Sequence, residues 1–247
     1  MGEKTSIIKV QEELERSGAG AELVGALATG LANYIPKVGP IIAEAINVNI
    51  PRQKIDNLII FAQVLGDRIK YLEDDLVTQK TQTAEFNDLL EDVLHQASRA
   101  LTDERRQHIA ALLTNSLSSE DLAHVEQKKL LALLGELNDA EIQMLKYYSL
   151  QGTEQREFAE RHTELFTPIS RTFGAPQINL DKGALQDSYR NKLMEVGLVR
   201  PVFKKPAKGT VPEFDDNTGR LKASSHTATS LGRLLLRYID ELSTALA

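Results

Sequence analysis

The sequence predicts a mostly α-helical protein, with an N-terminal helical bundle and a C-terminal winged-helix-like module that contains a small β-ribbon. Three observations lead to this fold class. Hydrophobic residues make up 42% of the 247-residue chain but aromatics only 5%, which favours helices over sheets. Amphipathic patterns of helical period follow one another through the first half of the chain. Near the C-terminus, the sequence indicates a helix that ends at a glycine, then a short β-ribbon and a final helix.

The segment over residues 19–50 consists mostly of small and apolar residues. It is expected to fold as a hairpin interrupted by Pro36 and Pro40. Its uncharged run from Leu23 to Pro36 is 14 residues long, whereas a membrane-spanning helix needs roughly 20. We expect the hairpin to be buried in the helical body or to contact another copy of the chain, and membrane insertion is the alternative. The residues predicted for oligomer or membrane contact are Leu23, Leu27, Leu31, Ile41 and Ile42.

A heptad pattern extends over residues 52–77, directly after Pro51, which suits a helix start. Apolar residues recur there at alternating spacings of three and four, at Ile55, Leu58, Ala62, Leu65, Ile69, Leu72 and Leu76. This seam predicts one long helix that packs along a partner helix of the same chain or of another copy. Three shorter amphipathic helices are expected between 86 and 137, and Thr102 is a predicted N-cap.

The boundary between the two predicted parts lies at Leu137-Asn138, which gives a helical body of residues 1–137 and a module of residues 138–247. Asn138 and Glu141 predict a capped helix at the start of the module. A second helix is expected to begin near Asp181 and to end at Gly197. Its buried stripe is predicted as Leu185, Tyr189, Leu193 and Val196.

The C-terminal module is the basic part of an acidic chain. Residues 181–240 hold 11 Lys and Arg against 7 Asp and Glu, a net charge of +4, which leaves −10 for the rest of a chain whose total is −6. Such an asymmetry permits contact with a polyanion or an acidic partner. The loop of the predicted ribbon would form the wing of a winged-helix module. The residues predicted for this contact flank that wing or lie on the helix before it: Lys204, Lys205, Lys208, Arg220, Lys222, Arg190 and Asn191.

The helix over residues 182–196 would be the groove reader if the module bound DNA. Its outward face is predicted to present Arg190 and Asn191, which can contact bases, but Asp187 and Glu195 lie on or beside the same face and repel phosphate. A protein-contact role for the module is therefore favoured over DNA binding.

Features of an enzyme are scarce in this sequence. It has no cysteine, which excludes thiolate catalysis and cysteine-ligated metals. Its five histidines are scattered without short-range pairs and are interpreted as solvent-facing or capping side chains. No phosphate-binding glycine loop or nucleophile elbow occurs. We expect no catalytic residues, no metal, no cofactor and no small-molecule substrate.

Two proline-containing segments, Tyr34–Pro40 and Asn49–Ile55, resemble those of bacterial Abi-alpha-type abortive-infection proteins and their helical relatives. The helical segments that follow and the ending with Gly197-Leu198-Val199 and Thr229–Gly232 are similar to the same group. The resemblance spans the chain from about Leu31 onward, and its motifs are structural and not reactive. It implies a bacterial origin and a role in phage defence or host-cell arrest.

These observations predict a non-enzymatic binding protein, an antiphage or abortive-infection component that acts through protein, oligomer or membrane contacts. A winged-helix DNA-binding transcriptional regulator is the first alternative, and a membrane-inserting toxic effector is the second. The start of the chain lacks the apolar core of a secretory signal, so we expect a cytoplasmic protein, with peripheral contact at the inner membrane as an option. We expect the chain to bind another protein or a second copy of itself.

Overall fold

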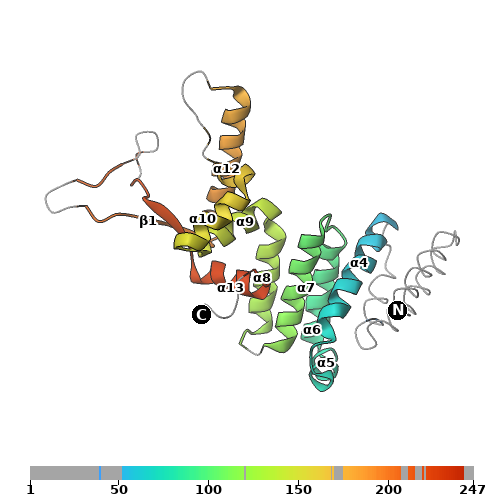
Figure 1. The fold of residues 1–247 in the computed structure, drawn as a ribbon. Coiled ribbons are helices and arrows are strands. Elements are labelled where there is room, and N and C mark those ends of the chain that lie inside the picture. Colours follow the sequence, from blue (N-terminus) through green and yellow to red (C-terminus); the bar gives the residue numbers. More distant parts are fainter. Residues whose placement is uncertain are drawn as a thin grey trace. The chain divides into compact units, whose positions relative to one another are not determined.

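The computed structural model describes residues 39, 52–119, 121–167, 169, 175–206, 211–214, 219 and 221–241. These residues are mostly helical, with one two-stranded antiparallel sheet near the C-terminus (Figure 1), which confirms the predicted fold class. The chain divides into two compact units: unit 1 comprises residues 1–135 and 238–240, and unit 2 comprises residues 136–237 and 241–247. The division falls at Gly135, near the predicted Leu137-Asn138 boundary, but residues 238–240 belong to unit 1.

Unit 1 is built around one central helix. Its described helices, in chain order, are α4 (Arg52–Ile69), α5 (Asp74–Lys80), α6 (Ala84–Ala97), α7 (Asp103–Ser118) and α8 (His124–Glu136). Five consecutive residues of α7, Ile109–Leu113, are buried, and a helix that is apolar around its whole circumference must be covered on several sides. Helices α4, α5 and α6 all pack against α7 and supply that cover. The predicted N-cap is confirmed, because the Thr102 hydroxyl accepts a hydrogen bond from the backbone N–H of Arg105.

The heptad seam is buried as far as the end of α4. Leu58, Ala62, Leu65 and Ile69 are all buried, and α4 packs along α7. The prediction of one helix over residues 52–77 is wrong, because α4 ends at Ile69 and α5 begins at Asp74.

The break between α4 and α5 has a local cause. Tyr71 is 82% exposed, and the seam residue beside it, Leu72, is only partly buried. Glu73 adopts an extended backbone, and the carboxylates of Asp74 and Asp75 occupy the first turn of α5, where they interact favourably with the positive end of the helix dipole. Val77 is the buried residue of this short helix.

Unit 2 contains four described helices, a two-stranded sheet and most of a fifth described helix, whose last residue, Tyr238, belongs to unit 1. They are α9 (Asp139–Ser149), α10 (Gly152–Arg161), α11 (Thr163–Phe166), α12 (Gln177–Glu195), β1 (Val199–Val202), β2 (Ser225–Ala228) and α13 (Ser230–Tyr238). The predicted capping box is confirmed at the start of α9. There the Asn138 side chain accepts from the N–H of Glu141, and the Glu141 carboxylate accepts from the N–H of Asn138.

Helix α12 is longer than predicted and only partly packed. It begins at Gln177, not near Asp181, and its C-terminal half contacts α9 and β1. Leu193 in that half is fully buried, as predicted. The predicted burial of Leu185 is wrong, since that side chain is 53% exposed. The reason is visible in Figure 1, where the N-terminal half of α12 projects beyond α9.

The chain leaves α12 through a Schellman motif at Gly197. Gly197 has a φ of +76°, its N–H donates to the Met194 carbonyl at 3.1 Å, and the N–H of Leu198 donates to the Leu193 carbonyl at 2.9 Å. The turn leads into β1, which pairs antiparallel with β2 so that Pro201 lies opposite His226. The glycine stop and the ribbon that the sequence predicts are both present.

The return from β2 into α13 depends on a close backbone contact. The N–H of Thr229 donates to the Leu198 carbonyl at 2.9 Å, and the Thr229 hydroxyl accepts from the N–H of Gly232 at 3.1 Å. A Cβ atom added at Gly232 would lie 2.3 Å from the Leu198 carbonyl oxygen. Only glycine fits this position without moving backbone.

Replacing Gly232 with alanine is expected to destabilise unit 2 by about 1–3 kcal/mol, because a backbone carbonyl must move to admit the methyl group. Urea unfolding measures the loss. The control is Gly135→Ala, whose Cβ would meet only the end of the flexible Gln96 side chain at 2.8 Å. That loss should be smaller, because the gain in helix propensity offsets the displaced side chain. Equal losses for the two variants would contradict the role of the Leu198 contact.

Candidate functional site

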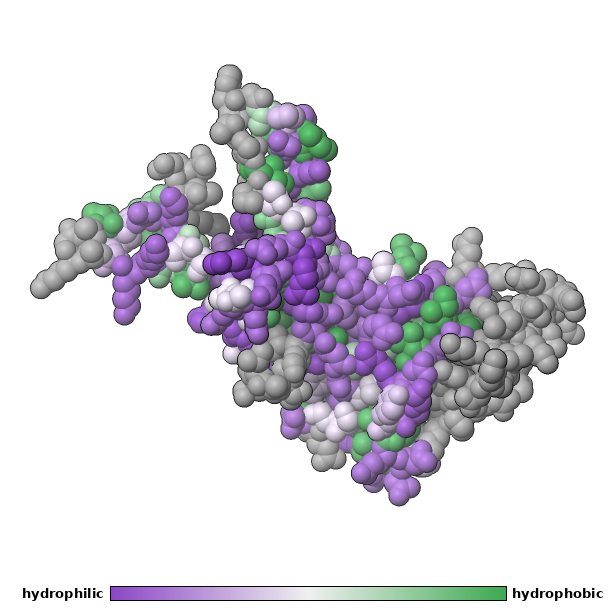
Figure 2. Space-filling model, in the orientation of Figure 1, coloured by the Kyte–Doolittle hydropathy of each residue, from purple (hydrophilic) through white to green (hydrophobic). Residues whose placement is uncertain are grey.

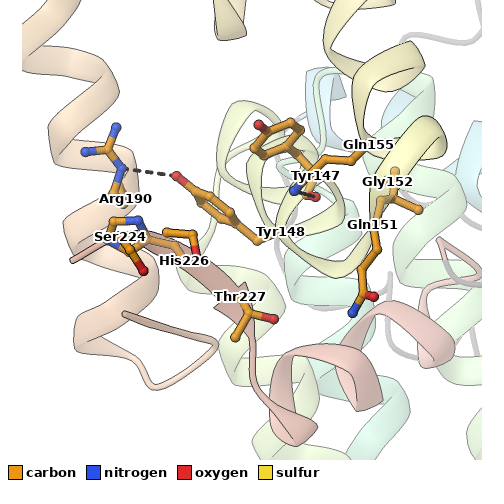
Figure 3. Close-up of a pocket in the computed structure, with 11 residues that line it drawn as sticks. Tyr147, Tyr148, Gln151, Gly152, Gln155, Arg190, Ser224, His226 and Thr227 are labelled. Atoms are coloured by element: carbon orange, nitrogen blue, oxygen red, sulfur yellow. Dashed lines mark hydrogen bonds between the residues drawn. The ribbon is translucent and has the colours of Figure 1, made fainter. Parts of the chain in front are cut away.

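An open pocket of about 670 Å³ lies in unit 2 (Figure 3). Three segments far apart in the sequence form it: the junction of α9 and α10, the middle of α12, and β2. Its lining residues are Tyr147, Tyr148, Leu150, Gln151, Gly152, Gln155, Arg190, Ser224, Ser225, His226 and Thr227. This lining contains one arginine, one histidine and no carboxylate.

The junction of α9 and α10 places the two tyrosines and the glutamines. Leu150 and Gln151 are extended, and Gly152 starts α10 with a φ of +58°, a conformation that suits glycine. The Gln155 amide reaches back and donates to the Tyr147 carbonyl at 3.0 Å. These contacts fix the turn that carries both rings into the pocket wall.

Tyr147 is held by aromatic neighbours. Its ring stacks on Phe166 with centroids 4.4 Å apart and meets Tyr148 edge-on at 5.3 Å. Burial, followed by the neighbouring Tyr148, raises the pKa of the Tyr147 hydroxyl above its ordinary value of 10.0. Tyr147 therefore remains a neutral hydrogen-bonding group.

Arg190 lies at the pocket and does not project as a groove-reading side chain. Its Nε donates to the hydroxyl of Tyr148 at 3.1 Å, and one terminal nitrogen donates to Asp187 at 3.2 Å (Figure 3 shows the first bond). Arg190, predicted on an outward polyanion-contact face, is partly buried and is bonded to a tyrosine 42 residues earlier in the chain. Asn191, predicted beside it, is exposed.

His226 projects from β2 beside Tyr148, with ring centroids 5.6 Å apart at an angle of 47°. Burial lowers the pKa of the imidazole below its ordinary value of 6.5, and the nearby Arg190 cation lowers it further. His226 is therefore neutral at neutral pH. The interpretation of the histidines as solvent-facing or capping side chains fails for half-buried His226 and for His108, which is buried in unit 1.

The predicted wing lysines lie away from this pocket lining. Lys204, Lys205 and Lys222 are exposed, and the amine of Lys222 lies 3.9 Å from Glu213. The predicted contact residues Lys208 and Arg220 are outside the described part of the chain, and so are Leu23, Leu27, Leu31, Ile41 and Ile42 of the apolar hairpin.

Large apolar side chains accompany the lysines on the ribbon. Phe214 and Leu221 face each other across an isolated antiparallel bridge, and both are about half exposed. Phe203 and Val211 are exposed as well. Figure 2 shows both hydrophobic and hydrophilic side chains on the ribbon. Within the described ranges, no helix combines the length and the apolar character needed to cross a membrane.

Sequence reasoning missed the pocket. The sequence does not predict the bond between Arg190 and Tyr148, nor the position of His226 beside Tyr148. Two features of the sequence could have indicated the pocket. They are the adjacent Tyr147 and Tyr148 at the end of a helix, and Gly152, which permits a turn shortly after them.

Acidification from about pH 7.5 to about pH 5 is expected to destabilise unit 2 through His226. The unfolded imidazole takes up its proton near pH 6.5, and the folded one does so only at lower pH, so the unfolded state binds more protons in this window. The contribution of His226 is complete above the unfolded pKa and is lost as the pH falls through the folded pKa.

Urea unfolding across this pH range measures the effect. His226→Gln should flatten the pH dependence, whereas Gln in place of the exposed His95 of α6 should leave it unchanged. A dependence that survives in His226→Gln would show that another group causes it.

The chain matches no family model, no curated protein and no solved structure. The resemblance to Abi-alpha-type proteins stays a prediction from the residues that carry it. The surfaces and the pocket of unit 2 are therefore the features of the chain that bear on its function.

Proposed function

We propose that the chain is a non-enzymatic binding protein of bacterial antiphage or abortive-infection defence, which acts in the cytoplasm through protein contacts made by unit 2. The observation that carries this proposal is the exposed apolar surface on the N-terminal half of α12. The place of the protein in phage defence is supported by the sequence resemblance alone.

The projecting half of α12 exposes side chains that a helix normally buries. Ile178 is 58% exposed and Leu185 is 53% exposed. They lie seven residues apart and therefore on the same side of the helix. Leu180, on another side, is 39% exposed. Three large apolar side chains exposed within eight residues of one helix favour a contact with another macromolecule.

The charges of α12 favour a protein over a nucleic acid as its partner. Arg190 is bonded to Tyr148 and Asp187, and the Lys192 amine lies 3.2 Å from Glu136. In the exposed half of the helix Lys182 is adjacent to Asp181, so the two charges balance. A helix that reads a DNA groove needs an excess of positive charge next to the phosphates, and the described residues of α12 provide none.

DNA binding is the second candidate function because of the ribbon. Lys204, Lys205 and Lys222 are exposed cations that would reach backbone phosphates if the ribbon served as a wing. Each neutralised phosphate would add to the salt dependence of binding.

A photocrosslinking amino acid placed at Leu185 is expected to form covalent adducts with protein in cells that express the chain. The same probe at Leu101, an exposed leucine of unit 1, is the matched control and should give at least about ten-fold less adduct, because burial of one leucine is worth a factor of that order in affinity. Leu185→Ser should also reduce protection in a phage plaque assay. Equal adducts at the two positions, or adducts that contain nucleic acid, would refute the protein-contact proposal.

Fluorescence anisotropy with a duplex of about 20 base pairs tests the DNA candidate. We expect only weak binding that Lys204→Glu with Lys205→Glu leaves nearly unchanged. Salt-dependent binding whose slope falls by about one for each lysine replaced would instead support the regulator. Glu in place of Lys129 on α8, outside the ribbon, changes the net charge as much as Lys204→Glu alone and is the control for that single variant.

A further inference from the structure

The pocket of unit 2 has the size and composition of a site for a small molecule. Its volume of about 670 Å³ falls in the range of roughly 300–1,000 Å³ typical of ligand pockets. Aromatic rings form part of its wall, and hydroxyl, amide and imidazole groups form most of the rest. The single guanidinium and the lack of a carboxylate in the lining favour a ligand with negative charge.

Arg190 is prepared for recognition of an oxyanion. Its Nε is fixed by Tyr148 at 3.1 Å and one terminal nitrogen by Asp187 at 3.2 Å, so the planar fork is already oriented before a ligand arrives. Because Asp187 balances part of the guanidinium charge, the site suits a ligand with one anionic group better than a polyphosphate.

The rings suit a planar ligand. Tyr148 and His226 are 5.6 Å apart and inclined at 47°, so they do not stack on each other and ring surface remains for another planar group. The neutral imidazole is able to both donate and accept a hydrogen bond.

Several polar groups of the pocket have no partner within the described part of the chain. No hydrogen bond from a described residue engages the side chain of Gln151, the hydroxyl of Thr227 or the imidazole of His226, whereas the Ser224 hydroxyl donates to the Val202 carbonyl at 2.9 Å. Figure 3 shows Gln151 beside the start of α10 and Thr227 on β2. These groups can satisfy the polar edge of a ligand.

We propose that this pocket binds a small molecule in which one carboxylate or phosphate group is attached to an aromatic or heteroaromatic ring. Arg190 holds the oxyanion, Tyr148 and His226 contact the ring, and Gln151 and Thr227 bond its polar edge. The site does not depend on the exposed surface of α12, so unit 2 has a ligand site and a docking surface that can be tested separately.

Titration of the isotope-labelled full chain, followed by backbone and imidazole NMR signals, tests this site. Benzoate and phenyl phosphate are the probes, benzamide is the neutral isostere of benzoate, and acetate supplies the anion without a ring. At least one ring-bearing anion should shift the signals of Gln151, His226 and Thr227 saturably. It should bind about ten-fold more tightly than benzamide or acetate, and the stronger of the two probes identifies the oxyanion.

Variants then assign the residues. Arg190→Gln should weaken binding about ten-fold or more, since hydrogen bonds to a charged group are lost. Lys192→Gln, a change of the same kind two residues along α12, should leave binding unchanged. Because Arg190→Gln also removes the bond to Tyr148, the exposed Gln151→Ala provides a second variant with little effect on the fold. The probe for it is 4-hydroxybenzoate, whose hydroxyl supplies the polar edge, and its binding should weaken about three-fold or more.

Four outcomes would overturn the proposal: no saturable shift with either anion at millimolar concentration, equal binding of benzamide, shifts confined to other residues, or unchanged affinity in both Arg190→Gln and Gln151→Ala. None of them bears on the crosslinks at Leu185. Failure of the ligand site and failure of the protein-contact function are therefore distinguishable.

Discussion

The close approach of Gly232 to the carbonyl of Leu198 is the constraint on which the arrangement of unit 2 depends. That carbonyl accepts from both the backbone N–H and the hydroxyl of Thr229, so the chain that leaves α12 and the chain that enters α13 are joined at one point. A side chain at Gly232 would separate them. Their junction holds β2 next to α9, and this places His226 beside Tyr148. The pocket is thus a product of backbone packing around one glycine.

Helix α12 combines two different roles along its length. Its C-terminal half is anchored by buried Leu193, and Arg190 on the same half completes the pocket. Its N-terminal half leaves Ile178 and Leu185 in water, and burial of each would be worth roughly 1.5–3 kcal/mol at most. This free energy remains available for a contact with a partner. Anchoring at one end and exposure at the other make a rigid element that presents an apolar surface.

The parts of the fold that the sequence predicts well are those set by local chemistry. Caps at Thr102 and Asn138 and the stop at Gly197 are recognisable because each is decided within a few residues. Periodicity is less informative, since it shows which residues share a side of a helix but not where a neighbouring helix ends. For this reason the periodicity predicts burial of Leu185, which is exposed, and one helix that continues past Ile69, where α4 ends.

The candidate site was beyond sequence reasoning for a different reason. Its rings, guanidinium and imidazole come from Tyr148, Arg190 and His226, which are separated by 42 and 36 positions. No spacing rule connects such residues, because their proximity is a result of tertiary packing. The exposed wing lysines Lys204 and Lys205, in contrast, follow directly from a charged loop between two strands.

Pro201 in β1 has a consequence for how this chain behaves at high concentration. A sheet of only two strands has open edges, and the ribbon carries exposed Phe203 and Phe214, a combination that invites stacking of chains into aggregates. Proline has no N–H to offer a third strand, so one position along that edge is closed to further pairing. The ribbon is able to display aromatic side chains in water while resisting fibril growth from β1.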